Sequence, residues 1–403
     1  MKKTICALVV ALTILICGAL TPVEAKIATE YSGDDMFSDL SVLPTITLVD
    51  GNLDINAASA VLIEPQTLTV LYESNRDEKL PPASITKIMS LLLIMEAIES
   101  GKFKLTTEIT ASEHACSMGG SQIWLEPGEK MTVDELLKAI VIASANDATV
   151  AVGEAIAGSE QAFVDMMNKR AAELGMENTH FVNCTGLDAE GHLTTAYDVA
   201  LMSCELIKHE LITKYSTVWM DTLRDGESQL VNTNKLVRFY DGCIGLKTGT
   251  TGGAGHCLSA AARRDGMTLI AVVMKGADSN ARFAGARAML DFGFANYSFK
   301  VIDSELDRNT LVKLRGGVKQ SVRVKAGDAL CVLSLKGTPK ITRQVFLNEK
   351  LKAPISEGDE VGKIVIASDG EEVGVIKITA AETVKKRSVF TVFGWLLKGI
   401  VSF

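Results

Sequence analysis

Residues 81–98 read PPASITKIMSLLLIMEAI, and this stretch decides the fold. The two prolines mark where a helix begins, because proline suits a first turn but disrupts a helix interior. The dense apolar run from Ile88 to Ile98 predicts a buried helix. Ser84 and Lys87 stand three residues apart at its start, so their side chains share one face. The stretch therefore predicts a buried helix that presents a hydroxyl and an amine together.

The surrounding chain predicts an α+β domain with helices packed on an antiparallel sheet. Residues 57–73 hold two apolar stretches on either side of Pro65-Gln66, the pattern of a β-hairpin. Thr132-Val-Asp-Glu135 is a capping box that opens a helix. Strands at both ends of the segment predict a sheet that joins them. Further helices are expected at 160–173, 195–208 and 280–292, and strands at 243–248, 256–262 and 267–275, with a turn at Asp265-Gly266.

Four parts are expected along the chain. Residues 1–25 carry two lysines, an apolar run and a small-residue cleavage pattern, which predicts a signal peptide and export. Residues 26–297 form the α+β domain, and residues 298–382, with short runs rich in Val, Leu and Ile, predict a small all-β domain. Residues 383–403 place basic residues beside an aromatic, apolar face, which favours a helix lying on a membrane surface. The alternative is a helix docked on the protein's own core.

Composition excludes several classes of function. The chain has 403 residues and a net charge of −8, so it lacks the basic surface that nucleic-acid binding needs. The histidines show no metal-ligand spacing and no Cys-x-x-Cys pair exists, which argues against a metal site or any other cofactor. Six of the cysteines lie beyond residue 25 without the density of a disulfide framework, and we expect free thiols.

Three short strings predict an acyl-transfer site. Ser84 is the candidate nucleophile, and a serine hydroxyl needs a base to take its proton. Lys87 is the candidate base, provided that it is neutral, which burial and a nearby positive charge favour by lowering its pKa. Lys247 is expected to supply such a charge. The alternative is a helix N-cap serine followed by a solvated lysine.

The second string, Ser144-Ala-Asn146, interrupts an apolar helix. Buried polar groups need partners, because an unpaired one costs about 1–3 kcal/mol. We expect Ser144 to relay protons and Asn146 to hold either a substrate amide or Lys87. The alternative is a helix end with local side-chain hydrogen bonds.

The third string, Lys247-Thr-Gly-Thr250, lies on a predicted strand. Gly249 allows a bound backbone to approach closely, and a peptide can lie along the strand edge. Its terminal carboxylate would then meet Lys247 and the Thr248 hydroxyl. The backbone amides of Ser84 and Thr250 are a candidate oxyanion hole. The alternative is an edge strand that leads into a glycine-rich turn.

These motifs resemble those of low-molecular-mass penicillin-binding proteins, the serine-type D-alanyl-D-alanine carboxypeptidases. The likeness covers about residues 55–297. It implies a DD-peptidase/β-lactamase-like fold, attack by Ser84 on the bond between the last two D-alanines of a peptidoglycan stem peptide, and acylation of Ser84 by β-lactams. It also implies that Arg282 lies near the carboxylate site, where the alternative is a charged, solvated helix face. Tyr197 stands where a branch of the family has arginine, which predicts a differently built carboxylate clamp.

Three other functions remain open at this point. A β-lactamase shares the first chemical steps, but the Glu-x-x-Leu-Asn string of class A enzymes does not occur between Asn146 and Lys247. A D,D-endopeptidase that cuts cross-links would use the same motifs. A non-enzymatic wall-binding scaffold would need none of Ser84, Lys87 and Lys247.

Overall fold

The computed structural model of the chain describes residues 49, 51–307, 309–337, 340–390 and 393. The predicted signal peptide and most of the predicted tail helix lie outside these residues. The described chain forms two compact units. The larger unit runs to Val301 and also takes in the segment that begins at Cys331. The smaller unit contains Ile302–Leu330 and the described residues from 340 onward. The single predicted boundary at residue 297 therefore misses the segment that returns to the larger unit.

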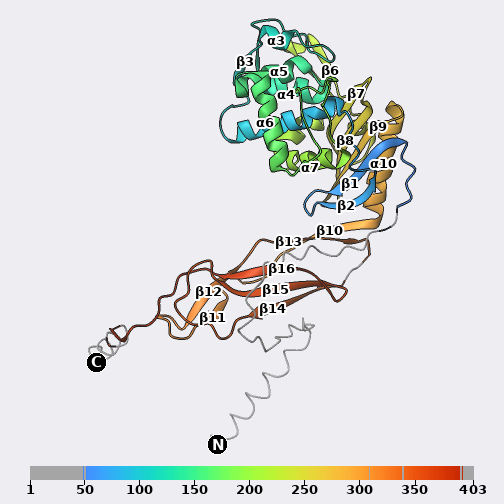
Figure 1. The fold of residues 1–403 in the computed structure, drawn as a ribbon. Coiled ribbons are helices and arrows are strands. Elements are labelled where there is room, and N and C mark those ends of the chain that lie inside the picture. The colour runs from blue at the N-terminus through green and yellow to red at the C-terminus, as the bar shows by residue number, and fades with distance from the viewer. Residues whose placement is uncertain (1–48, 50, 308, 338–339, 391–392, 394–403) are drawn as a thin grey trace, which may run out of the picture. The chain divides into compact units, whose positions relative to one another are not determined.

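The larger unit is built on a five-stranded antiparallel sheet in the order β2-β1-β9-β8-β7 (Figure 1). The first hairpin pairs with the last strands through β1 and β9, which confirms a sheet that joins the two ends of the segment. Strand β7 is at the edge of this sheet. The strands are β1 Ala57–Glu64, β2 Thr69–Ser74, β7 Cys243–Thr251, β8 Gly255–Arg264 and β9 Met267–Gly276.

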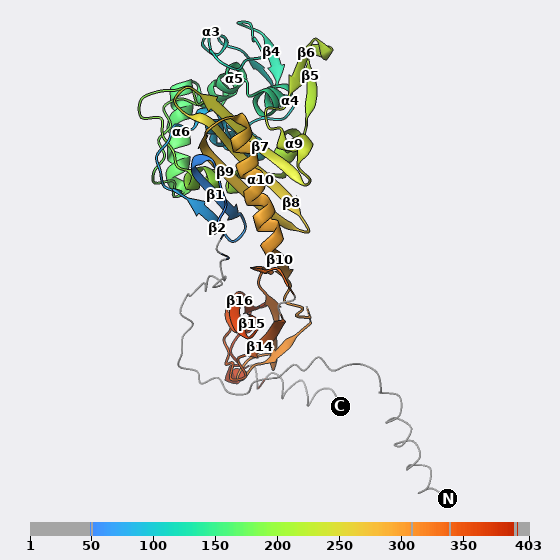
Figure 2. The same cartoon turned by 90° about the vertical axis from the view of Figure 1, so that its right-hand side faces the viewer.

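Helices cover both faces of this sheet. Helix α10 (Ser279–Asn296) lies across the strands on one face (Figure 2), and α7 (Ala196–Leu206) packs on the other. Strand β1 serves both layers, because Ala60 and Leu62 face the α10 side while Val61 and Ile63 face the α7 side. Helix α2 (Lys87–Glu99) packs behind α7 and is almost wholly buried, as its apolar run predicts.

Shorter elements surround this core. The Thr132 capping box is confirmed: the Thr132 hydroxyl accepts from the Glu135 amide at 3.3 Å, and the Thr132 amide donates to the Glu135 carboxylate at 2.9 Å. The remaining helices of the described chain are α3 Glu113–Cys116, α4 Val133–Lys138, α5 Asn146–Ala157, α6 Glu160–Glu173, α8 Thr213–Ser216 and α9 Leu236–Phe239. Two small strand pairs accompany them, β3 Glu108–Thr110 with β4 Lys130–Thr132, and β5 Met220–Leu223 with β6 Ser228–Val231.

The smaller unit is all-β, as the sequence predicts. Its five-stranded sheet has the order β11-β12-β16-β15-β14, and one of these strands, β14, was not predicted. The two-stranded sheet that pairs β10 (Tyr297–Ile302) with β13 (Leu330–Leu335) lies almost wholly in the larger unit. The strands of the larger sheet are β11 Leu311–Lys313, β12 Ser321–Ala326, β14 Ile341–Leu347, β15 Glu360–Ser368 and β16 Glu371–Ala380.

Candidate active site

Ser84 and Lys87 meet at the start of α2. Ser84 lies in a tight 3-10 turn, Ala83–Thr86, and the α-helix itself begins at Lys87. The Lys87 Nζ atom donates to Ser84 Oγ at 3.1 Å. The predicted juxtaposition of a hydroxyl and an amine is therefore present, with a tight turn in place of the expected first helical turn.

The Lys87 amine is fully buried and completely surrounded by oxygen acceptors. Besides Ser84 Oγ, it donates to Asn146 Oδ1 at 2.6 Å and to the Thr185 carbonyl at 2.7 Å. Burial lowers the pKa of Lys87 to about 7, and the acidic groups Cys184 and Asp147 oppose that shift. An amine with a pKa in this range is available as a base near neutral pH.

The second string shapes a backbone reversal. A π-helical turn, Ala139–Ala143, ends at Ser144, whose left-handed φ of +65° breaks the helix before α5 begins at Asn146. The Asn146 amide group donates from Nδ2 to the Gly119 carbonyl at 2.6 Å while its oxygen holds Lys87. Of the two partners expected for Asn146, the structure shows Lys87. The Ser144 Oγ atom is buried without a hydrogen-bond partner among the described residues.

The third string lies beside the Ser84 turn. Gly249 in β7 is so close that a Cβ atom there would lie 2.9 Å from the Ser84 amide nitrogen. The Lys247 amine is buried, and its pKa lies well below the usual value because of burial and the charges of Lys87 and Arg282. We expected the charge of Lys247 to help lower the pKa of Lys87, but the main cause of that lowering is burial. The Thr248 hydroxyl donates to the Thr233 hydroxyl at 2.7 Å.

Arg282 extends from α10 to the back of β7. Its Nη1 atom donates to the Gly249 carbonyl at 3.0 Å and to the Thr250 hydroxyl at 2.9 Å. Its side chain is buried, which rules out the solvated helix face, and its Nε atom has no hydrogen-bond partner among the described residues. Arg282 therefore fixes the strand that carries the third string and adds positive charge behind it.

A structural role for residues 183–187 escaped sequence reasoning. The Thr185 carbonyl holds Lys87, and Gly186, with φ of +88°, packs so tightly that a Cβ atom would lie 1.8 Å from the Ala83 carbonyl oxygen. The Asn183 side chain accepts from the Gly186 amide at 2.7 Å and fixes this turn. A backbone carbonyl has no side-chain signature, so only the glycine at 186 hinted at a close approach.

The position of Tyr197 predicts a carboxylate clamp that is built without an arginine there, and the structure shows what the Tyr197 side chain packs against instead. It lies in the first turn of α7, where the Arg76 guanidinium covers its ring at 4.9 Å and its amide donates to the Arg76 carbonyl. Besides Arg282, the Thr233 side chain, in the loop that precedes α9, contacts the third string through the Thr248 hydroxyl.

The assembled groups suit acyl transfer. The hydroxyl of Ser84 is hydrogen-bonded to a buried amine, and the turn that carries it faces an edge strand with buried positive charge behind it. A nucleophile, an adjacent base and backbone donors near the reacting atom are the parts that such a reaction requires. The structure brings together Ser84, Lys87 and Asn146 by direct contact. It places Lys247, Thr248, Gly249 and Thr250 along the neighbouring strand, which Arg282 of α10 contacts.

Comparisons with known proteins agree with this arrangement. Residues 46–278 match a family model described as D-alanyl-D-alanine carboxypeptidase, and residues 303–386 match one described as the C-terminal domain of penicillin-binding protein 5. The chain is 45% identical over 340 residues to D-alanyl-D-alanine carboxypeptidase DacF of Bacillus subtilis, which covers 83% of this chain and 87% of that protein.

Solved structures extend the likeness to the fold. Penicillin-binding protein 5 from Haemophilus influenzae matches with a TM-score of 0.73 and 28% identity, over 84% of this chain and 100% of that one. Penicillin-binding protein D2 from Listeria monocytogenes, in its ampicillin-bound form, matches with a TM-score of 0.56 and 29% identity, over 60% of this chain and 100% of that one.

Proposed function

The chain belongs to the D-alanyl-D-alanine carboxypeptidase family of serine peptidases, and from that premise we propose how its own residues remove the terminal D-alanine of a peptidoglycan stem peptide. The reaction is a serine-type carboxypeptidase reaction with an acyl-enzyme on Ser84. The observation that carries this assignment is the hydrogen bond of 3.1 Å between Ser84 Oγ and a buried amine with a pKa of about 7.

Binding places the peptide along the β7 edge. The edge strand offers its backbone groups to an added strand, and Gly249 lets the Ser84 turn lie directly against this strand. The terminal carboxylate meets the Lys247 amine and the Thr248 hydroxyl, with Arg282 behind the strand. A carboxylate stabilises the charged form of Lys247 and so offsets the burial that lowers its pKa.

Acylation begins when neutral Lys87 takes the proton of the Ser84 hydroxyl. A bond forms between Ser84 Oγ and the carbonyl carbon between the two D-alanines, and the amides of Ser84 and Thr250 receive the developing oxyanion. The C–N bond then breaks, and the leaving D-alanine amine takes a proton through the Ser144 hydroxyl. That hydroxyl has no hydrogen-bond partner in the described protein, so it is available for this relay.

Deacylation uses the same base a second time. Lys87 takes a proton from a water molecule, which attacks the acyl carbon, and Ser84 leaves with a proton. A β-lactam amide meets the same nucleophile and the same carboxylate-binding strand, so penicillins acylate Ser84 as well. The ampicillin- and cefotaxime-bound forms of the similar Listeria protein support β-lactam binding here.

Enzymes of this family act on the cell wall, and we propose the location of this chain from its N-terminal and C-terminal segments. Residues 1–25 predict export to the outer face of the membrane, and residues 383–403 predict attachment to its surface. In the described part of the chain, no helix is both long and apolar enough to cross a bilayer. Deleting residues 384–403 is expected to release the protein from membrane fractions, and continued sedimentation with membranes would contradict the anchor.

The function is tested by incubating the purified protein with a stem pentapeptide and measuring free D-alanine. Wild-type protein is expected to release D-alanine, and penicillin to block the release. Ser84→Ala is expected to abolish both D-alanine release and covalent labelling by a fluorescent penicillin, while Ser100→Ala, at the exposed C-terminal end of α2, keeps both. Labelling that persists in Ser84→Ala would remove Ser84 from the role of nucleophile.

A further inference from the structure

The segment 183–187 touches both reactive groups of the site. Its Thr185 carbonyl accepts from Lys87 Nζ at 2.7 Å, and Gly186 packs directly against the backbone of the Ser84 turn. Any shift of this segment therefore moves the acceptor that orients the Lys87 amine. What holds the segment in place consequently matters for the position of the base.

The residue between them, Cys184, is anchored from two sides. Its carbonyl accepts from the Ser90 hydroxyl of α2 at 2.7 Å. Its amide donates to Glu160 Oε1 at 3.3 Å, and its thiol donates to the same oxygen at 3.4 Å. Cys184 is completely buried, so its amide has no access to solvent in place of Glu160. Glu160 is thus the side chain that satisfies the buried amide donor of Cys184.

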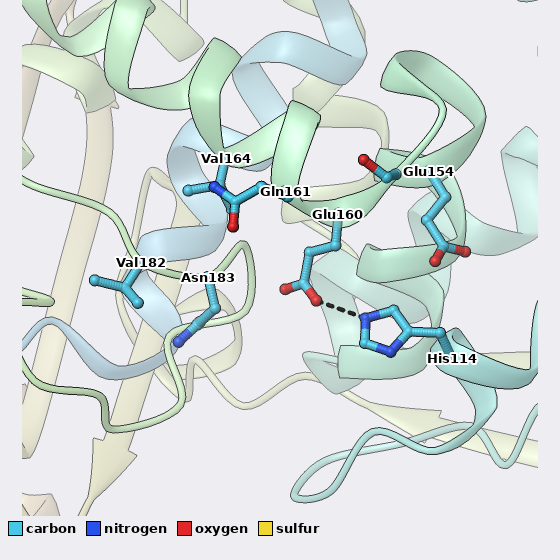
Figure 3. A pocket seen from close by; sticks show the side chains of 8 residues that line it. His114, Glu154, Glu160, Gln161, Val164, Val182 and Asn183 are labelled. Atoms are coloured by element: carbon cyan, nitrogen blue, oxygen red, sulfur yellow. Dashed lines mark hydrogen bonds and ion pairs between the residues drawn. The ribbon is translucent and has the colours of Figure 1, made fainter.

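Glu160 itself is held at the first turn of α6. Its second oxygen, Oε2, pairs with His114 Nε2 at 2.8 Å, and Figure 3 shows the carboxylate lying between His114 and Asn183. A cavity of about 310 Å³ opens in front of it. The lining of this cavity is His114, Glu154, Ser159, Glu160, Gln161, Val164, Val182 and Asn183, and neither Ser84 nor Lys87 is among these residues.

We propose that Glu160 is a positioning residue for the catalytic base, acting through the Cys184 amide to hold the Thr185 carbonyl on Lys87. This inference rests on the proposed function, because it assigns Lys87 the role of base. Glu160 touches neither substrate nor Ser84, and its effect is geometric. The hydrogen bond from the Cys184 amide needs an acceptor oxygen at hydrogen-bonding distance, and it does not need that oxygen to carry a negative charge.

Two substitutions separate reach from charge. Glu160→Asp keeps the charge but withdraws the carboxylate by about 1.5 Å, the length of one C–C bond, from the Cys184 amide. Glu160→Gln keeps the reach and an acceptor oxygen but removes the charge. A misplacement of this size in a catalytic group costs up to about 100-fold. The expected result is at least a tenfold slower acylation by fluorescent penicillin in Glu160→Asp, and a rate within about threefold of wild type in Glu160→Gln.

A pH profile distinguishes positioning from loss of stability. Burial lowers the pKa of Lys87, and Cys184 and Asp147 oppose that shift; the charge of Lys87 in turn lowers the pKa of Lys247. When the Thr185 carbonyl moves away, the charged amine loses an acceptor, so the acid limb of the acylation rate in Glu160→Asp is expected to move to lower pH. A variant that is merely less stable would leave this limb where it is. An unmoved limb together with a wild-type rate overturns the proposal.

Two controls complete the experiment. Gln161→Ala changes the neighbouring residue of the same cavity and is expected to keep the wild-type rate and limb. Cys184→Ala removes the thiol but keeps the amide contact, so its acylation rate is expected to stay within about threefold of wild type. A tenfold loss of that rate would overturn the role given to the amide, even if Glu160→Asp does not fold. Equal losses in Glu160→Asp and Glu160→Gln would also overturn it. Failure of the proposed function shows separately, as penicillin labelling of Ser84→Ala.

Discussion

The acid limb of acylation is the sharpest test of Lys87 as the base. With a pKa of about 7, the neutral share of the Lys87 amine is about 9% at pH 6, about 50% at pH 7 and about 90% at pH 8. Only the neutral amine accepts the Ser84 proton. The acylation rate at saturating penicillin is therefore expected to rise about tenfold from pH 6 to pH 8 and then to level off.

The alternative gives a different curve. A lysine with its usual pKa of 10.5 would be under about 1% neutral at pH 8, so the rate would climb about 100-fold from pH 6 to pH 8 without levelling off. Stopped-flow acylation with a fluorescent penicillin at saturating concentration measures the curve, and thermal unfolding at each pH confirms that the protein stays folded. A hundredfold rise without a plateau would refute the structural account of Lys87.

Three further results are expected. The folded-state pKa of Lys87 is below its unfolded value, so the unfolded chain binds more protons than the folded chain above pH 7. The free energy of unfolding of wild type, compared with that of Lys87→Met, should therefore rise by about 2 kcal/mol from pH 7 to pH 9. Urea denaturation at each pH measures this difference. Because burial keeps the pKa of Lys247 well below its usual value and a bound carboxylate raises it, binding of a D-Ala-D-Ala peptide to Ser84→Ala should take up protons, seen as buffer-dependent calorimetric heats that Lys247→Arg abolishes. Thr132→Ala should cost about 1 kcal/mol of stability, measured by denaturation, while leaving penicillin labelling intact.

The secondary structure that the sequence predicts best is the part with local signals. The hairpin of β1 and β2, the Thr132 capping box and the helix at residues 160–173 all rest on turn residues, caps or periodicity within a short window. Strand β14 escaped prediction because its residues are mostly half-buried or exposed and alternate poorly. The return of residues after Cys331 to the larger unit escaped as well, since pairing with β10 depends on distant residues.

In the site, too, some features have a local signal in the sequence and others depend on the fold. The side chains to which we assign the chemistry, Ser84, Lys87 and Asn146, could be named from short strings, because each proposed role requires a specific residue type, and the structure brings them into contact. Their supports were not found. The Thr185 carbonyl is a backbone group, and its position follows from the fold of a loop that any residue type at 185 would share. Tyr197 carried only an expectation about the clamp, and the packing of its ring against Arg76 had no signal in the sequence.

The pKa of Lys87 shows why a sequence motif cannot stand in for the packing of the folded chain around it. A string with serine and lysine three residues apart says only that an amine is near a hydroxyl, and a solvated amine there would be charged and useless as a base. Burial at the start of α2 lowers the pKa of Lys87 to about 7, which suits the lysine to the role of base that we propose. Burial alone would leave the amine's donors unpaired, so the same fold must supply oxygen acceptors at fixed positions. Asn146 supplies one from the sequence motif, and Thr185 supplies another from the backbone. The pKa and the position of the Lys87 amine therefore depend on the assembled core. Residues that hold this core in place can affect the proposed base without contacting the substrate.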